Sequence, residues 1–195
     1  MGESGEGVGV VPASDDLTRQ GALRKLRLWN LVVGCVLLLE GALMLALSSD
    51  FKLPVTTNYL SETTSKGMGN TVLRTVTELR VGPLVALFLL LSGLALLLLT
   101  LPRINGWYVR NLERGANYAR WMEYSVTASL MIVVIAMLSG IYDLSTLILL
   151  FFLNAMMILF GWMMELHNQS TERTDWTAFF FGCIAGAIPW VVIFI

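Results

Sequence analysis

Five long apolar runs dominate this sequence of 195 residues and limit what it can fold into. They extend over residues 28–48, 81–101, 118–139, 144–166 and 176–195. A helix needs about 20 apolar residues to cross the hydrocarbon core of a bilayer, and each run has roughly that length. Only 14% of the residues are charged, whereas a soluble domain has about 25%. The sequence therefore predicts an all-α integral membrane protein with five transmembrane helices.

Basic residues flank the runs unevenly and predict the orientation of the chain. They collect before the first run and between the second and third runs (Arg19, Arg24, Lys25, Arg27, Arg103, Arg110, Arg114). The loop between the third and fourth runs has none, and the loop after the first run also carries acids. Because basic loops tend to stay in the cytoplasm, we expect a multi-pass protein of the plasma membrane with a cytoplasmic N-terminus.

Two segments outside the runs have recognisable patterns. Residues 1–20 are polar and rich in glycine and lack the features of a signal peptide, so we expect a disordered tail before a transmembrane domain over residues 21–195. The first outer loop, about residues 49–80, has two segments rich in Val, Thr and Leu around the turn sequence "SKGMGN". This pattern predicts a β-hairpin, with a flexible loop as the alternative.

The remaining side chains give little support for an enzyme, a metalloprotein or a nucleic-acid-binding protein. Cys35 and Cys183 both lie in apolar runs, where a small packing residue is the usual interpretation. His167 is the one histidine, and no second His or Cys lies at metal-ligand spacing from it. No basic cluster extends beyond the helix flanks. The lipid bilayer is the expected partner, and we predict no enzymatic activity, no metal and no nucleic acid.

Three acidic residues, Glu40, Glu123 and Glu165, lie in the apolar runs or at their edges. A charge at the centre of a membrane helix costs about 2.5–3.5 kcal/mol, so such a residue is usually neutralised or used. Glu123 either balances a buried cation or relays a proton, or it pairs with Arg120 one turn earlier. Thr127, one turn later, is placed to donate a hydrogen bond to Glu123. Glu40 is expected near the bilayer centre, and Glu165 at a solvated helix end.

Several motifs along the chain resemble those of the heliorhodopsins. They are "LRLWNLVVG", "VGPLVALFLLLSG", "ARWMEYSVTASLMI", "LFFLNAMMILFGWMME" and "FGCIAGAIPW". With the long first outer loop, they cover nearly the whole chain after residue 20. The resemblance implies a rhodopsin-like bundle of seven helices that binds retinal and senses light. It also implies a cytoplasmic N-terminus, a β-hairpin in the first outer loop, a homodimer and a signalling partner that the sequence does not identify.

The resemblance further implies roles for individual residues in the runs. In this family retinal is held as a Schiff base on a lysine of the seventh helix. The glutamate of the "RWMEYS" stretch, here Glu123, is implied to be the counterion of that Schiff base. The residues implied to approach the chromophore or its polar network are Ser92, Thr127, Asn154, Met157, Gly161, Pro189 and Trp190.

The sequence departs from the family pattern in three ways. It ends in "IPWVVIFI" after the fifth run, which leads us to expect a truncated chain with five of the seven helices. Its lysines, Lys25, Lys52 and Lys66, all lie outside the runs, so we expect no covalent attachment of retinal. Family histidines of the first two helices are absent from "GCVLLLEGA" and "LSGLALLLL", and Glu40 stands where a glutamine is expected.

These features together predict a retinal-binding, light-sensing membrane protein with a signalling or regulatory role, lacking here the helix that carries the retinal lysine. The alternative is a truncated relative without a chromophore, acting as a structural or interaction protein of the membrane. A proton or ion transporter is less well supported, because the runs hold too few polar residues to trace a continuous path.

Overall fold

The computed structural model describes residues 13–60, 71–171 and 173–195. Within these ranges, five helices are long and apolar enough to cross a membrane. Their bounds are α1 Ala13–Leu47, α2 Val81–Thr100, α4 Tyr118–Leu138, α5 Leu144–His167 and α6 Thr177–Phe194. Each helix overlaps one of the predicted apolar runs, so the predicted all-α membrane fold with five spans is confirmed.

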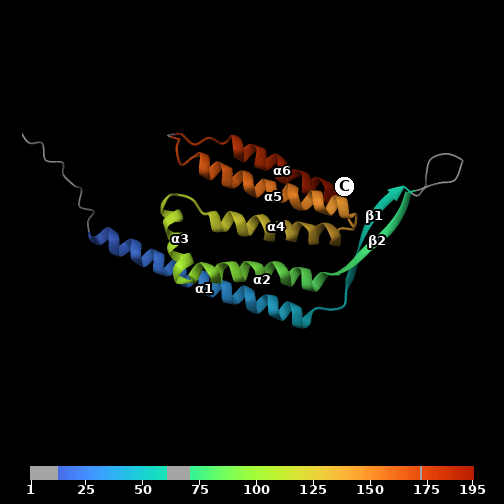
Figure 1. The fold of residues 1–195 in the computed structure, drawn as a ribbon, viewed down its shortest axis with the longest axis horizontal. Coiled ribbons are helices and arrows are strands. Elements are labelled where there is room, and N and C mark those ends of the chain that lie inside the picture. The colour runs from blue at the N-terminus through green and yellow to red at the C-terminus, as the bar shows by residue number, and fades with distance from the viewer. Residues whose placement is uncertain (1–12, 61–70, 172) are drawn as a thin grey trace, which may run out of the picture.

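The five long helices lie side by side as a layer in chain order, and successive helices run in opposite directions (Figure 1). At one end of the layer, which we call the α3 end, are the start of α1, the short helix α3 (Pro102–Glu113) and the α5–α6 loop. At the other end, the hairpin end, are the β-hairpin and the α4–α5 turn. Most contacts between the described spans are therefore between neighbouring helices of the layer.

Helix α1 begins at Ala13, within the segment expected to be a disordered tail, and residues 1–12 lie outside the described residues. Two polar contacts fix it at the α3 end. The Nη2 atom of Arg19 lies 2.7 Å from Oε1 of Glu113, and Nε of Arg27 donates a hydrogen bond to the carbonyl oxygen of Thr100 at 3.0 Å. The start of α1 is therefore joined to the ends of α2 and α3.

Glycine allows α1 and α2 to approach closely within the membrane. A Cβ atom added at Gly93 would lie 3.0 Å from the carbonyl oxygen of Gly34, and one added at Gly34 would lie 3.1 Å from that of Gly93. Small residues at such crossings let helix backbones pack against each other where no water drives association. The α1–α2 pair is therefore a close-packed unit beside the rest of the layer.

The loop between α1 and α2 forms the predicted antiparallel hairpin, from strands β1 Lys52–Leu60 and β2 Thr71–Arg80. The predicted turn "SKGMGN" falls within residues 61–70, outside the described residues. Val55 of β1 is 2% exposed and packs in a cluster with residues of the α4–α5 region. The backbone N–H of Thr56 also donates to the carbonyl oxygen of Tyr142 at 2.8 Å. The hairpin therefore connects the α1–α2 pair to the turn between α4 and α5.

Helix α3 is an element that the apolar runs do not predict. It spans 12 residues and begins with Pro102, a residue that suits the first turn because its missing N–H has no partner there in any case. It ends before Gly115, whose φ of 75° favours glycine. Its Tyr108 side chain is 7% exposed, so one face packs against the protein. The segment between the second and third spans is therefore helical and docked.

Candidate functional site

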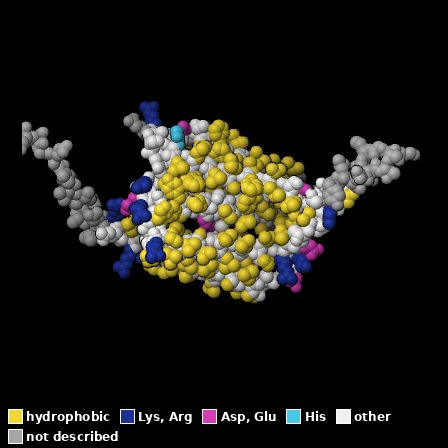
Figure 2. All heavy atoms as spheres, in the orientation of Figure 1, with side chains coloured by type: hydrophobic (Ala, Val, Ile, Leu, Met, Phe, Trp, Pro, Cys, Tyr) yellow, Lys and Arg dark blue, Asp and Glu magenta, His cyan; other side chains and the backbone are white. Residues whose placement is uncertain are grey.

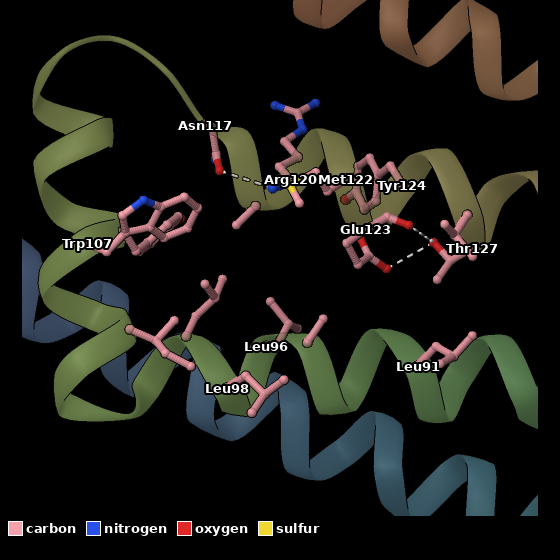
Figure 3. Close-up of a pocket in the computed structure, with 16 residues that line it drawn as sticks. Leu91, Leu96, Leu98, Trp107, Asn117, Arg120, Met122, Glu123, Tyr124 and Thr127 are labelled. Carbon is pink, nitrogen blue, oxygen red and sulfur yellow. Dashed lines mark hydrogen bonds between the residues drawn. The ribbon is translucent and has the colours of Figure 1, made fainter.

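The carboxylate of Glu123 lies on α4 and faces α2 (Figure 3). Helix α4 begins next to Asn117, whose side chain accepts a hydrogen bond from the backbone N–H of Arg120 at 3.2 Å. This cap satisfies one of the free N–H groups at the helix start. The start of the helix fixes the rotation of the turns that follow, and so helps to direct Glu123 towards α2.

Two hydroxyl groups contact the same oxygen of Glu123. The hydroxyl of Ser92, on α2, donates to Oε1, and Oγ1 of Thr127 lies 2.9 Å from the same atom. Thr127 is 6% exposed, and its position one turn after Glu123 puts it on the same face of α4. The structure therefore brings together Ser92, Glu123 and Thr127, from two neighbouring spans.

The alternative pairing of Glu123 with Arg120 is not seen in the structure. The guanidinium carbon of Arg120 lies 5.2 Å from the ring centroid of Trp121 and 5.5 Å from that of Tyr124. These distances are typical of cation–π contacts, and Figure 3 shows the Arg120 side chain directed away from α2. Among the ion pairs of the described residues, none includes Glu123. Glu123 is thus contacted by neutral donors in this part of the chain.

A cavity of about 550 Å³ lies beside Glu123, between α2, α3 and α4. Figure 2 shows a hollow among hydrophobic side chains of the layer, with acidic atoms at its rim. Most of its wall is apolar and comes from α2 and α4, while α3 contributes Ile104, Trp107 and Tyr108. Glu123 and Thr127 are part of the same wall (Figure 3). The carboxylate therefore borders a largely apolar space, whose wall also includes Arg120.

The other residues implied by the resemblance do not line this cavity. Asn154 of α5 donates from Nδ2 to Oγ of Ser129 at 3.2 Å, and both side chains are buried between α4 and α5. The remaining four lie on α5 and α6: Met157 against Gly186, Gly161 against the ring of Trp121, Pro189 buried, and Trp190 exposed. Of the residues that the resemblance implies, the structure brings only Ser92 and Thr127 into contact with Glu123.

Glu165 is not the solvated helix end that the sequence suggests. Its Oε2 atom accepts a hydrogen bond from the backbone N–H of Asn117 at 3.1 Å and another from the indole Nε1 of Trp121. It therefore connects the end of α5 to the first turn of α4, two residues before Glu123. Glu40, by contrast, is exposed on α1 and does not line the cavity.

A separate polar cluster closes the α5–α6 loop at the α3 end. Asn168 accepts the backbone N–H of Asp175 at 2.7 Å and donates to its carbonyl oxygen at 3.1 Å. Hydrogen bonds from Thr177, through its side chain and then its backbone N–H, hold the pKa of Asp175 below its ordinary value, and His167 lowers it further. Nε2 of His167 is 3.4 Å from Oδ2 of Asp175. These contacts order the loop but do not reach Glu123.

Sequence reasoning missed two contributions to the site. The cavity wall formed by Trp107 and Tyr108 depends on α3, and the contact of Glu165 with Trp121 depends on how α4 and α5 pack. A signal for helix α3 is present in the sequence: Ile104, Tyr108 and Asn111, which lie on its less exposed face, have helical spacing. No group of three or more His, Cys, Asp or Glu within the described ranges is arranged to hold a metal ion.

The comparisons with known proteins agree with this fold. Residues 26–195 match the family model described as Heliorhodopsin. The comparison with curated proteins gives no match. The match includes all residues of the Glu123 site and runs through the five spans and the hairpin. The chain therefore belongs to the heliorhodopsin family.

Proposed function

We propose that this retinal-type membrane protein senses light, and that Glu123 is the counterion of a retinal Schiff base. The observation that supports this is the carboxylate of Glu123 beside a largely apolar cavity, with Ser92 and Thr127 as neutral donors. A charge in such surroundings is costly unless an opposite charge lies close by. Retinal, when bound as a Schiff base, supplies a light-absorbing polyene with one positive charge.

The residues at this site could hold the positive charge of such a ligand, but they do not include a lysine to which retinal could be attached. Ser92 and Thr127 hold Oε1 of Glu123 in place, which leaves the carboxylate oriented towards the cavity. Lys25 is exposed on α1, Lys52 lies on β1 in a 3.5 Å ion pair with Glu78, and Lys66 is outside the described residues. In this proposal the chain holds and orients the cation, and none of the described lysines, which do not line the cavity, supplies the amine.

The test supplies the amine from outside. We expect the chain in lipid nanodiscs to bind the Schiff base of all-trans retinal with n-butylamine and keep it protonated at neutral pH, with a long-wavelength visible band. With free retinal, no such band should form, because no lysine among the described residues lines the cavity. Absence of the band with the amine-bearing probe would contradict the proposed cation site. A stable band with free retinal that survives bleaching controls would contradict the statement on attachment.

We also propose that the α3 end of the layer is cytoplasmic, in the plasma membrane. The basic residues at that end support this orientation. In a background without Cys35 and Cys183, a cysteine at exposed Arg114 should be protected from an impermeant thiol reagent added outside intact cells. A cysteine at exposed Glu78, on β2, should be labelled. Labelling of the first and protection of the second would reverse the proposed orientation.

A regulatory role through a homodimer and an unidentified signalling partner is part of the same proposal and rests on family membership alone. The second candidate function is that of a membrane protein without chromophore that acts through protein contacts. The observation that favours it is that no lysine among the described residues lines the cavity beside Glu123. Failure of the amine-bearing probe to bind would select this second function.

A further inference from the structure

Helix α3 presents a row of three arginines and one tryptophan on its exposed side. Arg103, Trp107 and Arg110 of α3 and Arg114, the residue directly after the helix, follow each other at spacings of four, three and four residues, which places the first three on one face of the helix. All four side chains are exposed; Trp107 is 40% exposed. We call this row the α3 stripe. A row of this composition is suited to the boundary between lipid and water, where tryptophan and arginine both collect.

The fold fixes the direction in which the α3 stripe faces. On the other side of the helix, Tyr108 is 7% exposed, and Nδ2 of Asn105 donates to the carbonyl oxygen of Leu99 at 3.0 Å. Trp107 lies at the edge of the α3 stripe, because its partly exposed ring also lines the cavity and lies 6.3 Å from the ring of Tyr118, the first residue of α4. Because Tyr108 and Asn105 hold the other side of α3, the three arginines are left exposed.

Helix α3 lies directly beside the ends of two spans. Helix α2 ends at Thr100 and α3 begins at Pro102, and α4 begins at Tyr118 only a few residues after α3 ends. Figure 1 shows α3 crosswise at the end of the spans. A helix that connects two spans in this way lies at the boundary of the hydrocarbon core, and its exposed side is within reach of phosphate groups.

The arginines of the α3 stripe are not paired with acidic side chains among the described residues, whereas two basic residues at the hairpin end are. There, Arg80 pairs with Asp50 at 3.1 Å and Lys52 with Glu78 at 3.5 Å. At the α3 end, Glu113 is paired with Arg19 at 2.7 Å, and no ion pair among the described residues includes an arginine of the α3 stripe. Figure 2 shows several basic side chains together at this end. The net positive charge there is complementary to an anionic surface.

We propose that the α3 stripe binds the phosphate groups of anionic phospholipids, with Trp107 at the level of the headgroups. Arginine is suited to this because its planar guanidinium donates two parallel hydrogen bonds to a phosphate. Each basic side chain near an anionic membrane surface strengthens binding roughly fivefold. Three of them on one face give a preference for anionic over zwitterionic lipid. The site also positions α3, and with it the cavity wall that Trp107 and Tyr108 provide.

The test titrates the detergent-solubilised full chain with phosphatidylglycerol or phosphatidylcholine and counts bound lipids by native mass spectrometry. We expect the parent to prefer phosphatidylglycerol by roughly tenfold or more. The triple variant R103Q/R110Q/R114Q should lose this preference. The matched variant K52Q/R74Q/R80Q removes three basic side chains at the hairpin end and should keep it. The single variant R110Q should reduce the preference for phosphatidylglycerol roughly fivefold. This variant tests the proposal if the triple variant does not fold.

Four results would overturn the proposal. The first is that the parent binds both lipids equally, and the second is that R110Q and the triple variant keep the parent's preference. The third is that excess inorganic phosphate abolishes the preference, which would make the α3 stripe a site for free anions and not for lipid. The fourth is that K52Q/R74Q/R80Q also loses the preference, which would show that net charge, and not the α3 stripe, is responsible.

Discussion

Replacing Glu123 by glutamine should remove most of the protonated form of a bound retinal Schiff base at neutral pH. Glutamine keeps the shape of the side chain and an oxygen that Ser92 and Thr127 can still contact, so the cavity wall should be preserved. The negative charge is lost. A neighbouring opposite charge favours the charged form of a group by about 10- to 1,000-fold, and this factor should disappear. The measurement is the ratio of long- to short-wavelength bands of the butylamine probe.

Glu40→Gln is the matched control for this experiment. It makes the same chemical change in another span, at a side chain that is exposed on α1 and does not line the cavity. The band ratio of this variant should equal that of the parent. If Glu40→Gln removes the long-wavelength band while Glu123→Gln leaves it unchanged, the counterion lies on α1 and the assignment of Glu123 is wrong.

Replacing Gly161 by alanine should destabilise the contact between α4 and α5. The new Cβ would lie 2.7 Å from two ring atoms of Trp121. The ring cannot easily move, because its Nε1 atom donates to Glu165. Overpacking of this kind typically costs 1–3 kcal/mol, about 1 kcal/mol of which is offset by the higher helix propensity of alanine. The expected result is a lower midpoint of thermal unfolding in detergent.

A double-mutant cycle tests whether Glu165 is the reason for this sensitivity. In Glu165→Ala the indole of Trp121 is released, so adding Gly161→Ala should cost less than it does in the parent, with a coupling of about 0.5–3 kcal/mol. Gly21→Ala is the control, because nothing lies within 4 Å of the added Cβ, and it should be neutral or slightly stabilising. Equal costs of Gly161→Ala in both backgrounds would show that Glu165 does not hold the ring.

The spans and the hairpin were predictable from sequence because each is specified locally. Length and hydrophobicity alone define a membrane helix, and alternating β-branched residues around a glycine turn define a hairpin. Helix α3 was not predictable in this way. It has 12 residues of mixed polarity, too few for a span, and its stability depends on contacts such as that of Tyr108, which exist only once α2 and α4 have packed.

Some contacts of the site were likewise predictable from the sequence of a single helix, whereas others depend on how the helices pack. The position of Thr127 beside Glu123 follows from helix periodicity, whereas that of Ser92 depends on which face of α2 meets α4 and came only from the family resemblance. Glu165 looked solvated because its place near the end of α5 says nothing about the first turn of α4 opposite it. Asn154 was expected to approach the chromophore or its polar network, which stays a prediction; in the structure its partner is Ser129, between α4 and α5.

The hairpin has a mechanical consequence for the boundary between α2 and α4. One end of this boundary is closed by the chain itself, through α3, and the other by the backbone hydrogen bond from Thr56 to Tyr142. The two helices are thus connected at both ends, and separating them at the hairpin end would require breaking the hydrogen bond between Thr56 and Tyr142. The separation of Ser92 and Glu123, between the two connections, is set by these connections as well as by their own hydrogen bond.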